Sequence, residues 1–464
     1  MSEAQPRPVT IIDRPCRFGK TTRMIADLEE AKQYLIVTPL LTECDRIVRD
    51  ARVPVMQPEI VEDEPDITTK KDHLVQLLQA QKNAVTTHAM FDHLADVAGE
   101  GLLDAYHILI DEVVSVADSS FRCTEIEWRD FYLNTGYAKV DPATGQVIAT
   151  PLWEDNAEEV SGTLSAKAYR AARSGRLFSV GEGIHISVIP EILLRAGQSL
   201  TVFTFKAEGS LMFAHLDRLG LNPVHDSDGP EVERGFVREV RHLINVQRIP
   251  ALDRRTVRVK GKPVRLSDCM SYSKQMMTPA TSVTLDTEIA KALASLRRGP
   301  LASVALPDIL VVCPKDKWFE KGREPGKGPD GTETTPFRPG PYADGSRLAP
   351  RGTGKDRARS IPNKTQGTNA YRHASHVIYL YDQYPTPLVH RWVGGKDAID
   401  PDDYALTELI QVIWRTRIRD GEPITAYIPN RRMRELFLSW LWEGDVPQSV
   451  RNKIASQQGS KPGR

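Results

Sequence analysis

The sequence has 464 residues, of which 40% are hydrophobic and 26% charged. This composition is typical of a soluble globular chain of roughly two to four domains, and it excludes wholesale disorder. The 61 basic and 61 acidic residues cancel, but residues 1–230 carry 22 basic and 35 acidic side chains, a net charge of −13, whereas residues 231–464 carry 39 and 26, a net charge of +13. Such asymmetry points to contact with nucleic acid or a membrane, or simply to two domains with different surfaces.

The cysteines and the apolar runs indicate the cellular compartment of the protein. The five cysteines are scattered, and none lies at the spacing of a zinc site or a disulfide framework. The first residues hold no apolar segment of signal-peptide length, and no apolar run reaches the ~18 residues that span a bilayer. We therefore expect a soluble, cytoplasmic protein without membrane contact.

The first half of the chain alternates short apolar runs with helix-like stretches, which predicts an α/β lobe over residues 1–230. An insertion with helical content is expected at about 119–198, and the polar sequence HDSDGPEVERG around 225–235 predicts a linker. The expected strands of this lobe are 9–12, 34–38, 83–86, 107–110 and 200–205.

A second α/β pattern predicts another lobe over 231–445. Between its first two strands, residues 316–364 contain 8 Gly, 7 Pro and 11 Lys or Arg, a composition that predicts an extended or mobile loop. Residues 446–464 predict a basic, flexible tail. The expected strands are 309–313, 376–381 and 424–428, and the expected helices are about 284–297, 404–416 and 431–442.

Residues 9–22, VTIIDRPCRFGKTT, predict a phosphate-binding loop between a strand and a helix. The backbone N–H groups of such a loop and the helix N-terminus wrap the phosphates, Lys20 adds a positive charge, and the Thr21 hydroxyl binds Mg²⁺. The full pattern G-x-x-x-x-G-K-[ST] has glycine where this chain has Arg14, so an ordinary strand–turn–helix with an exposed lysine remains an alternative. The residues assigned to the nucleotide are Arg17, Phe18, Gly19, Lys20, Thr21 and Thr22.

A second motif, HILIDEV at 107–113, is an apolar strand that ends in two carboxylates. Asp111 would hold Mg²⁺, and Glu112 would orient and deprotonate the attacking water. A strand that ends in a polar turn is the alternative. Because the motif follows the G-K-T strand by about 90 residues with further strands between, the two together predict binding of ATP and Mg²⁺.

The order of these motifs resembles superfamily 2 helicases, in particular the divergent DEAD/DEAH-like helicases that bacteriophages encode. Val37–Leu40 and Thr86–His88 follow strands where the family has loops that touch nucleic acid. Leu200–Ser210 stands where the family couples hydrolysis to domain movement, Gly367–Asn369 resembles the fifth motif, and Gln411–Arg419, QVIWRTRIR, resembles the sixth. The resemblance implies an α/β fold of two tandem RecA-like P-loop lobes with one ATP between them.

The sixth motif would supply arginines that stabilise charge on the transferring phosphoryl group. The resemblance assigns Gln411 to the nucleotide and Arg415 to the catalytic machinery. The second arginine is Arg417 or Arg419, and we favour Arg419. The sequence departs from the family at Trp414, where the family has glycine, so a cationic helix end favoured by the helix dipole is the alternative.

The nucleic-acid track is inferred from charge and from the resemblance. Binding to the phosphate backbone of single-stranded or forked DNA is expected, with RNA as a possible substitute. Trp318 and Phe337 are expected to stack on bases, and the basic stretch 254–265 is a further candidate. The named contact residues are Thr38, Pro39, Thr87, Thr368, Asn369, Arg351, Lys355, Arg357 and Arg359.

Together these features predict an ATP-dependent helicase or translocase that acts in phage replication or recombination, with phage replication proteins as potential partners. One alternative is a packaging ATPase and nuclease of the large-terminase type, whose metals would need carboxylates such as Asp382, Asp400, Asp402 and Asp403. The other is a non-enzymatic nucleic-acid-binding protein with a degenerate P-loop, which Arg14 and Arg17 motivate.

Overall fold

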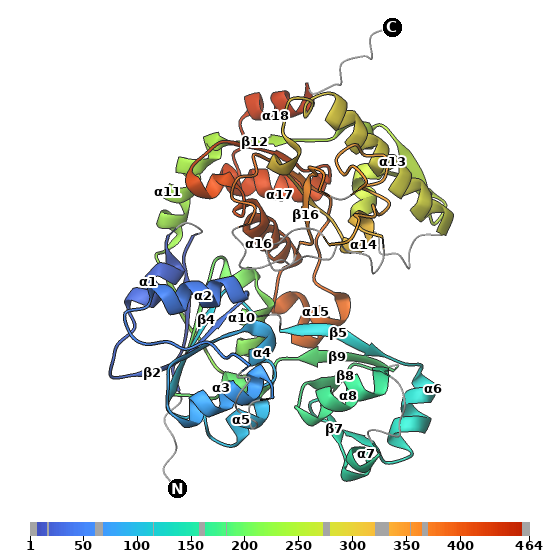
Figure 1. Ribbon diagram of the computed structural model, residues 1–464. Helices are drawn as coiled ribbons and strands as arrows, with labels where there is room; N and C mark the ends of the chain where they lie inside the picture. The colour runs from blue at the N-terminus through green and yellow to red at the C-terminus, as the bar shows by residue number, and fades with distance from the viewer. Residues whose placement is uncertain are drawn as a thin grey trace. The chain divides into compact units, whose positions relative to one another are not determined.

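The computed structural model describes residues 7–15, 18–60, 68–114, 116–156, 163–181, 183–271, 279–320, 334–352, 354–363 and 370–456 (Figure 1). The chain divides into two compact units. Each unit contains a parallel β-sheet with helices, which confirms the predicted α/β class. The first unit comprises Met1–Asp228 and Pro385–Asp403, and the second comprises Gly229–Tyr384 and Tyr404–Arg464.

The sheet of the first unit has six parallel strands in the order β11-β1-β10-β4-β2-β3. Because β10 lies between β1 and β4, Asp13 pairs with Thr204, and Asp111 pairs with Phe203. The carboxyl ends of the three strands that carry the predicted motifs are therefore neighbours. The strands are β1 (Val9–Asp13), β2 (Gln33–Thr38), β3 (Ala84–Thr87), β4 (Tyr106–Asp111), β10 (Ser199–Thr204) and β11 (Val224–Ser227).

Strand residues of this sheet alternate between two apolar cores, one on each face. Ile11, Ile108 and Val202 pack into one core, whereas Ile36 and Leu109 pack into the other with residues of α1 and α2. Strands buried on both faces account for the continuous apolar runs of the sequence. The helices are α1 (Lys20–Ala26), α2 (Leu41–Asp50), α3 (Lys70–Gln79), α4 (His88–Phe91), α5 (Ala95–Gly99), α9 (Glu191–Leu194) and α10 (Leu211–Arg218).

The stretch between β4 and α9 forms a substructure of its own. A three-stranded antiparallel sheet, β5-β9-β8, and a hairpin, β6-β7, accompany helices around an aromatic core of Trp128, Tyr132, Trp153 and Tyr169. Its elements are β5 (Ala117–Arg122), α6 (Glu125–Glu127), a π-helix (Trp128–Leu133), β6 (Ala138–Val140), β7 (Val147–Ala149), α7 (Pro151–Asp155), α8 (Thr163–Arg173), β8 (Leu177–Ser179) and β9 (Ile184–Val188).

Residues 385–403 leave the second unit and return to the first, where they include α15 (Pro387–Val393). This differs from the predicted second lobe, 231–445, which includes the segment. Val389 is buried in the first unit's core, and the Trp392 ring meets the rings of Phe178 and His215, with the Arg218 guanidinium 4.2 Å from its centre. Apolar and cation–π contacts therefore fix α15 to the first unit.

Replacing Trp392 by Ala is expected to lower the free energy of unfolding of the first unit by about 3 kcal/mol, because it removes a large ring from several contacts. Urea denaturation followed by circular dichroism measures the change. Ile126→Ala is the control, since the Ile126 side chain is 63% exposed and its removal should change the free energy by less than about 0.5 kcal/mol. Equal effects of the two substitutions would contradict the anchoring role of Trp392.

The second unit is built on a five-stranded parallel sheet with the order β12-β18-β17-β15-β16. A separate antiparallel hairpin, β13-β14, packs beside α13. The elements are α11 (Pro230–Val240), β12 (Ile244–Gln247), α12 (Pro250–Asp253), β13 (Thr256–Val259), β14 (Lys262–Arg265), α13 (Pro279–Arg298), β15 (Ile309–Val312), α14 (Lys315–Trp318), β16 (Arg359–Ile361), β17 (His376–Tyr379), α16 (Pro401–Ile413), β18 (Ile424–Tyr427), α17 (Arg431–Leu441) and α18 (Gln448–Ala455).

Three segments that we expected to be irregular carry structure. The predicted linker overlaps β11 and the first half of α11, and the predicted flexible tail includes α18, whose Ile454 is buried. Within 316–364, the side chains of Phe337, Tyr342 and Leu348 are buried in the second unit's core. In the described part of this segment, glycine and proline shape turns around these few apolar anchors, which composition alone does not show.

Candidate functional site

The segment after β1 leads into α1 as a phosphate-binding loop requires. Gly19 precedes α1 with a φ of +66°, a backbone conformation that glycine adopts without strain. The Lys20 Nζ donates to the Arg14 carbonyl at 2.9 Å, and the Pro15 carbonyl lies 3.5 Å from it. Phe18 is 47% exposed, and the Thr22 hydroxyl accepts a hydrogen bond from Arg46, while Arg17 lies outside the described residues.

The two predicted Mg²⁺ ligands meet. The Thr21 hydroxyl donates to the Asp111 Oδ2 at 2.9 Å. Asp111 is 5% exposed, and burial followed by repulsion from Glu112 raises the pKa of its carboxyl to about 6, although Thr21 and Lys20 oppose the shift. A buried carboxylate beside a hydroxyl is the donor set that a hard cation such as Mg²⁺ prefers, so these residues fit the metal.

Replacing Asp111 by Asn is expected to stabilise the metal-free protein at pH 8. A raised pKa stabilises the folded state fully below about pH 4, and this stabilisation is lost as the pH rises through about 6. The substitution removes the buried charge, so the free energy of unfolding in EDTA should rise by up to about 3 kcal/mol at pH 8, with a smaller effect at pH 4. Melting curves at both pH values measure it, and equal stability of variant and wild type at pH 8 would contradict the buried charge.

Glu112 follows Asp111 with a φ of +63°, a left-handed backbone conformation that residues other than glycine rarely adopt. Its N–H donates to the Phe203 carbonyl at 3.0 Å, which ties the end of β4 to β10. A left-handed residue costs about 1–3 kcal/mol and persists where its surroundings impose it, often at functional sites. The strained backbone marks Glu112 as a candidate catalytic residue.

His88, the last residue of the predicted loop Thr86–His88, connects that loop to the second predicted motif. Its Nε2 lies 3.1 Å from the main-chain carbonyl of Asp111, and because a carbonyl can only accept, Nε2 donates in this contact. His88 is the first residue of α4 and directly follows Thr87. It therefore links the loop after β3 to the carboxyl end of β4.

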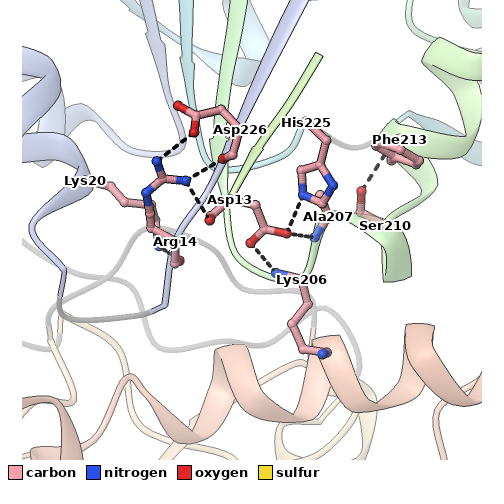
Figure 2. Close-up of polar contacts among 9 residues, drawn as sticks. All are labelled: Asp13, Arg14, Lys20, Lys206, Ala207, Ser210, Phe213, His225 and Asp226. Carbon is pink, nitrogen blue, oxygen red and sulfur yellow. Dashed lines mark hydrogen bonds and ion pairs between the residues drawn. The ribbon is translucent and has the colours of Figure 1, made fainter. Parts of the chain in front are cut away.

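Asp13, which sequence reasoning missed, holds the loop after β10 (Figure 2). Its carboxylate accepts hydrogen bonds from the N–H groups of Lys206 and Ala207, at 2.9 and 2.8 Å, and lies 3.0 Å from the Nε2 of His225. Lys206 adopts a φ of +56° at this turn. The predicted coupling segment 200–210 is thus tied directly to the last residue of β1. The sequence feature that could have identified Asp13 is its position, at the end of an apolar strand just before the P-loop.

The loops after β2 and β3 enclose a hollow of about 580 Å³ that Pro39 and Thr87 line together with Lys70. Sequence reasoning missed Lys70, the first residue of α3, because no motif marks it. Thr38 is fully buried, and its hydroxyl contacts the Leu40 carbonyl at 3.3 Å. The structure therefore does not present the Thr38 side chain to a ligand, in contrast to the prediction.

The predicted contacts in 316–364 divide into exposed and buried residues. Arg351, Lys355 and Arg359 are exposed, and Arg351 pairs with Asp344. Arg357 is buried, lies over the Phe337 ring, and donates to the Pro350 carbonyl. Arg357 is therefore a structural residue and not the predicted contact to a nucleic-acid backbone.

The aromatic side chains predicted to stack on bases belong to the core instead. Trp318 is 2% exposed and Phe337 4% exposed, so neither presents a ring face to a nucleic acid. Thr368 and Asn369 lie outside the described residues. By contrast, the basic stretch 254–265 forms the hairpin β13-β14, and all six of its cations are exposed: Arg254, Arg255, Arg258, Lys260, Lys262 and Arg265.

The predicted sixth motif lies at the end of α16, in the second unit. Trp414 is buried, and its ring contacts the rings of Phe236 and Trp440, which explains a large side chain where the helicase family has glycine. Gln411 is half-buried on α16, and Arg415 is 6% exposed just after it. Arg419 is half-buried in the following short helix, Arg417–Asp420. Their roles remain predictions.

Comparison with known proteins finds relatives along most of the chain. Residues 255–441 match the family model described as the YonV C-terminal Rossmann-like domain. The chain is also 22% identical over 456 residues to the SPbeta prophage-derived uncharacterized protein YonV of Bacillus subtilis (strain 168), an alignment that covers 93% of this chain and 98% of the relative.

Solved structures with a similar course of the chain include three XPD proteins. A structure named XPD_Helicase has a TM-score of 0.48 at 14% identity, with 95% of both chains covered. XPD_APO has a TM-score of 0.47 at 13% identity and covers 94% of this chain and 96% of its own, and Xpd4 of S. tokodaii has 0.44 at 12%, with 93% of both. Similarity at this level leaves the function to be inferred from the site.

Proposed function

We propose that this protein is an ATP-driven nucleic-acid translocase or helicase. The observation that carries the proposal is the 2.9 Å hydrogen bond between Thr21, at the start of α1, and Asp111, at the end of β4. It joins the two motifs that a P-loop ATPase needs, although they are about 90 residues apart in sequence. Glu112 and Lys20 lie beside them in the sequence and complete a hydrolytic set.

Each residue of this set has a chemical role in the proposed reaction. Thr21 and Asp111 would hold Mg²⁺, which when bound neutralises charge on the phosphates. Lys20, whose Nζ donates to the Arg14 carbonyl, would also donate to a phosphate oxygen. Glu112 orients the attacking water and accepts its proton. Arg415, with Arg419 or Arg417, would stabilise negative charge on the phosphoryl group.

The nucleic-acid part of the proposal is supported by surface chemistry in each unit. In the first unit, the hollow beside Pro39 and Thr87 has Lys70 at its wall. In the second, the hairpin 254–265 carries six exposed cations and no acidic residue. Lys70 and the cations of the hairpin suit a phosphodiester backbone, whereas much of the hollow, including Leu40, Val85 and Met90, is apolar. Binding should therefore be independent of sequence and weaken with salt. Action in phage replication or recombination is part of the proposal, and the prophage origin of the relative supports it.

The terminase alternative is less well supported by the carboxylates it needs. The Asp382 side chain is 3% exposed and pairs with Arg432 at 2.8 Å. Asp400, Asp402 and Asp403 belong to the first unit, whereas Asp382 belongs to the second. In the part of the chain that the structure describes, no three His, Cys, Asp or Glu side chains gather as a metal site would require.

No described helix is long and apolar enough to cross a membrane.

The proposal is tested by phosphate release from Mg-ATP with single-stranded DNA, duplex DNA and RNA in parallel, and with no nucleic acid. Hydrolysis that a nucleic acid stimulates, and that Lys20→Ala removes, is the expected result. Phosphate release no higher than that of Lys20→Ala would support a non-enzymatic binding protein. Metal-dependent cleavage of plasmid DNA that Asp382→Ala abolishes would support a terminase.

A further inference from the structure

Arg14 occupies the position where the full P-loop pattern has glycine, and its side chain points away from the loop toward the end of β11 (Figure 2). Its Nη2 lies 2.8 Å from the Asp226 Oδ1, and its Nε lies 2.8 Å from the Asp228 Oδ2. Its Nη1 donates to the main-chain carbonyls of Asp226 and Asp13. Only 14% of the Arg14 side chain is exposed, so this guanidinium is held in one place by two carboxylates and two carbonyls.

The main chain of Arg14 connects the same point to the rest of the site. Its N–H donates to the Thr204 carbonyl at the end of β10, at 3.1 Å. Its carbonyl accepts the 2.9 Å hydrogen bond from the Lys20 Nζ. A phosphate oxygen would compete for the three donors of the Lys20 ammonium. Nucleotide binding therefore changes the contacts of the residue that also holds Asp226 and Asp228.

The two aspartates that Arg14 holds lie where the chain passes from the first unit to the second. Asp228 is the last residue of the first unit before the chain passes to Gly229 and the second unit. Asp226 lies on β11, an edge strand whose side chains are mostly exposed. β11 is held to β1 by strand pairing and by the contact between His225 and Asp13. The charge-assisted contacts of Arg14 extend this tie to Asp226 and Asp228, where the chain leaves the first unit.

We propose that Arg14 is a positioning residue that transmits nucleotide binding from the P-loop to the connection between the units. Its side chain fixes Asp226 and Asp228, while its carbonyl and N–H belong to the loop that receives the phosphates. A glycine at this position would leave the loop able to bind phosphate but would remove the link. The inference rests on the proposed nucleotide binding and adds the route by which that binding reaches the second unit.

The test measures how much a nucleotide changes affinity for nucleic acid. Fluorescence anisotropy gives the Kd of a labelled single-stranded oligonucleotide with and without AMP-PNP and Mg²⁺, and the ratio of the two Kd values is the coupling. The variants are Arg14→Gly, which restores the P-loop pattern, Asp226→Asn with Asp228→Asn, and Arg14→Lys. Arg23→Ala is the matched control, since this arginine is 77% exposed and pairs only with Asp27 among the contacts described for it.

We expect the coupling ratio to fall at least about fivefold in Arg14→Gly and in the double Asn variant, with an intermediate loss in Arg14→Lys, which keeps the charge but not the fork. The Kd for AMP-PNP should stay within about threefold of the wild type, and Arg23→Ala should match the wild type in both. A lower coupling ratio at an unchanged Kd for AMP-PNP separates this positioning role from a purely structural one, which would change both.

A wild-type ratio in Arg14→Gly and in the double Asn variant, or a wild-type ratio of one, would overturn the inference. Phosphate release by the same wild-type preparation separates this failure from that of the proposed function. If the wild type hydrolyses ATP with stimulation by nucleic acid while the variants keep full coupling, only the proposed role of Arg14 is wrong. If the wild type neither binds AMP-PNP nor hydrolyses ATP, both proposals fail.

Discussion

Replacing Glu112 by Gln is expected to lower the kcat for ATP hydrolysis by about 10²–10⁴, because an amide cannot accept the proton of the attacking water. The side chain keeps its size, so binding of ATP should change by less than about threefold. Phosphate release under saturating ATP and nucleic acid measures kcat, and a fluorescent nucleotide measures binding. Turnover at the wild-type rate would remove Glu112 from the catalytic role.

The backbone at this residue supplies a control. Glu112 has a φ of +63°, which glycine adopts readily, so Glu112→Gly should not lower the melting temperature and should still abolish turnover. Loss of turnover in a variant that is at least as stable as the wild type cannot be attributed to unfolding. A marked drop in melting temperature in Glu112→Gly would show instead that the carboxylate holds the end of β4 together.

Replacing Arg415 by Lys is expected to lower kcat by about 10³, the lower end of the range for arginine fingers, because a lysine lacks the planar fork that bridges phosphoryl oxygens. The positive charge remains, so the Kd for ATP should change little. Single-turnover hydrolysis measures the chemical step. Arg451→Lys is the control in the same unit, since its side chain is 44% exposed and pairs with Glu435. Equal rates for the two variants would rule out the role of Arg415.

The same assay decides between the two candidates for the second arginine. Arg417 donates through its Nε to the Pro423 carbonyl at 2.7 Å and lies 3.9 Å from Glu422. We expect Arg417→Lys to lower kcat much less than Arg419→Lys does. The reverse order would exchange their assignments.

The central strands of both sheets were predictable because they are apolar on both faces, as in the run HILID of β4. β11 was missed because its four residues, VHDS, are mostly exposed on a sheet edge and show no apolar alternation. α11 was missed because its buried residues, Phe236, Val237 and Val240, all lie near its end, so its first turns resemble a polar linker. Segments that bury few side chains, such as β11 and the first turns of α11, leave no apolar pattern in the sequence.

The candidate site was predictable where a motif carries its chemistry, as at Lys20, Thr21, Asp111 and Glu112. It was not predictable where the function of a residue depends on contacts distant in sequence. Asp13 meets the loop 193 residues later, and no local pattern announces that pairing. Charge was a poor guide for the same reason, since Arg357 resembles its exposed neighbours in sequence but is buried over Phe337.

The return of residues 385–403 to the first unit sets an order for the folding of the chain during synthesis. A ribosome delivers residues 1–228 first, but the core of that unit also needs Val389 and Trp392, which emerge only after most of the second unit has been made. The first unit therefore waits, incompletely covered, for more than 150 residues of translation. A fragment that ends at residue 228 should aggregate or require chaperones, and a peptide of residues 385–403 supplied in trans should increase its soluble yield.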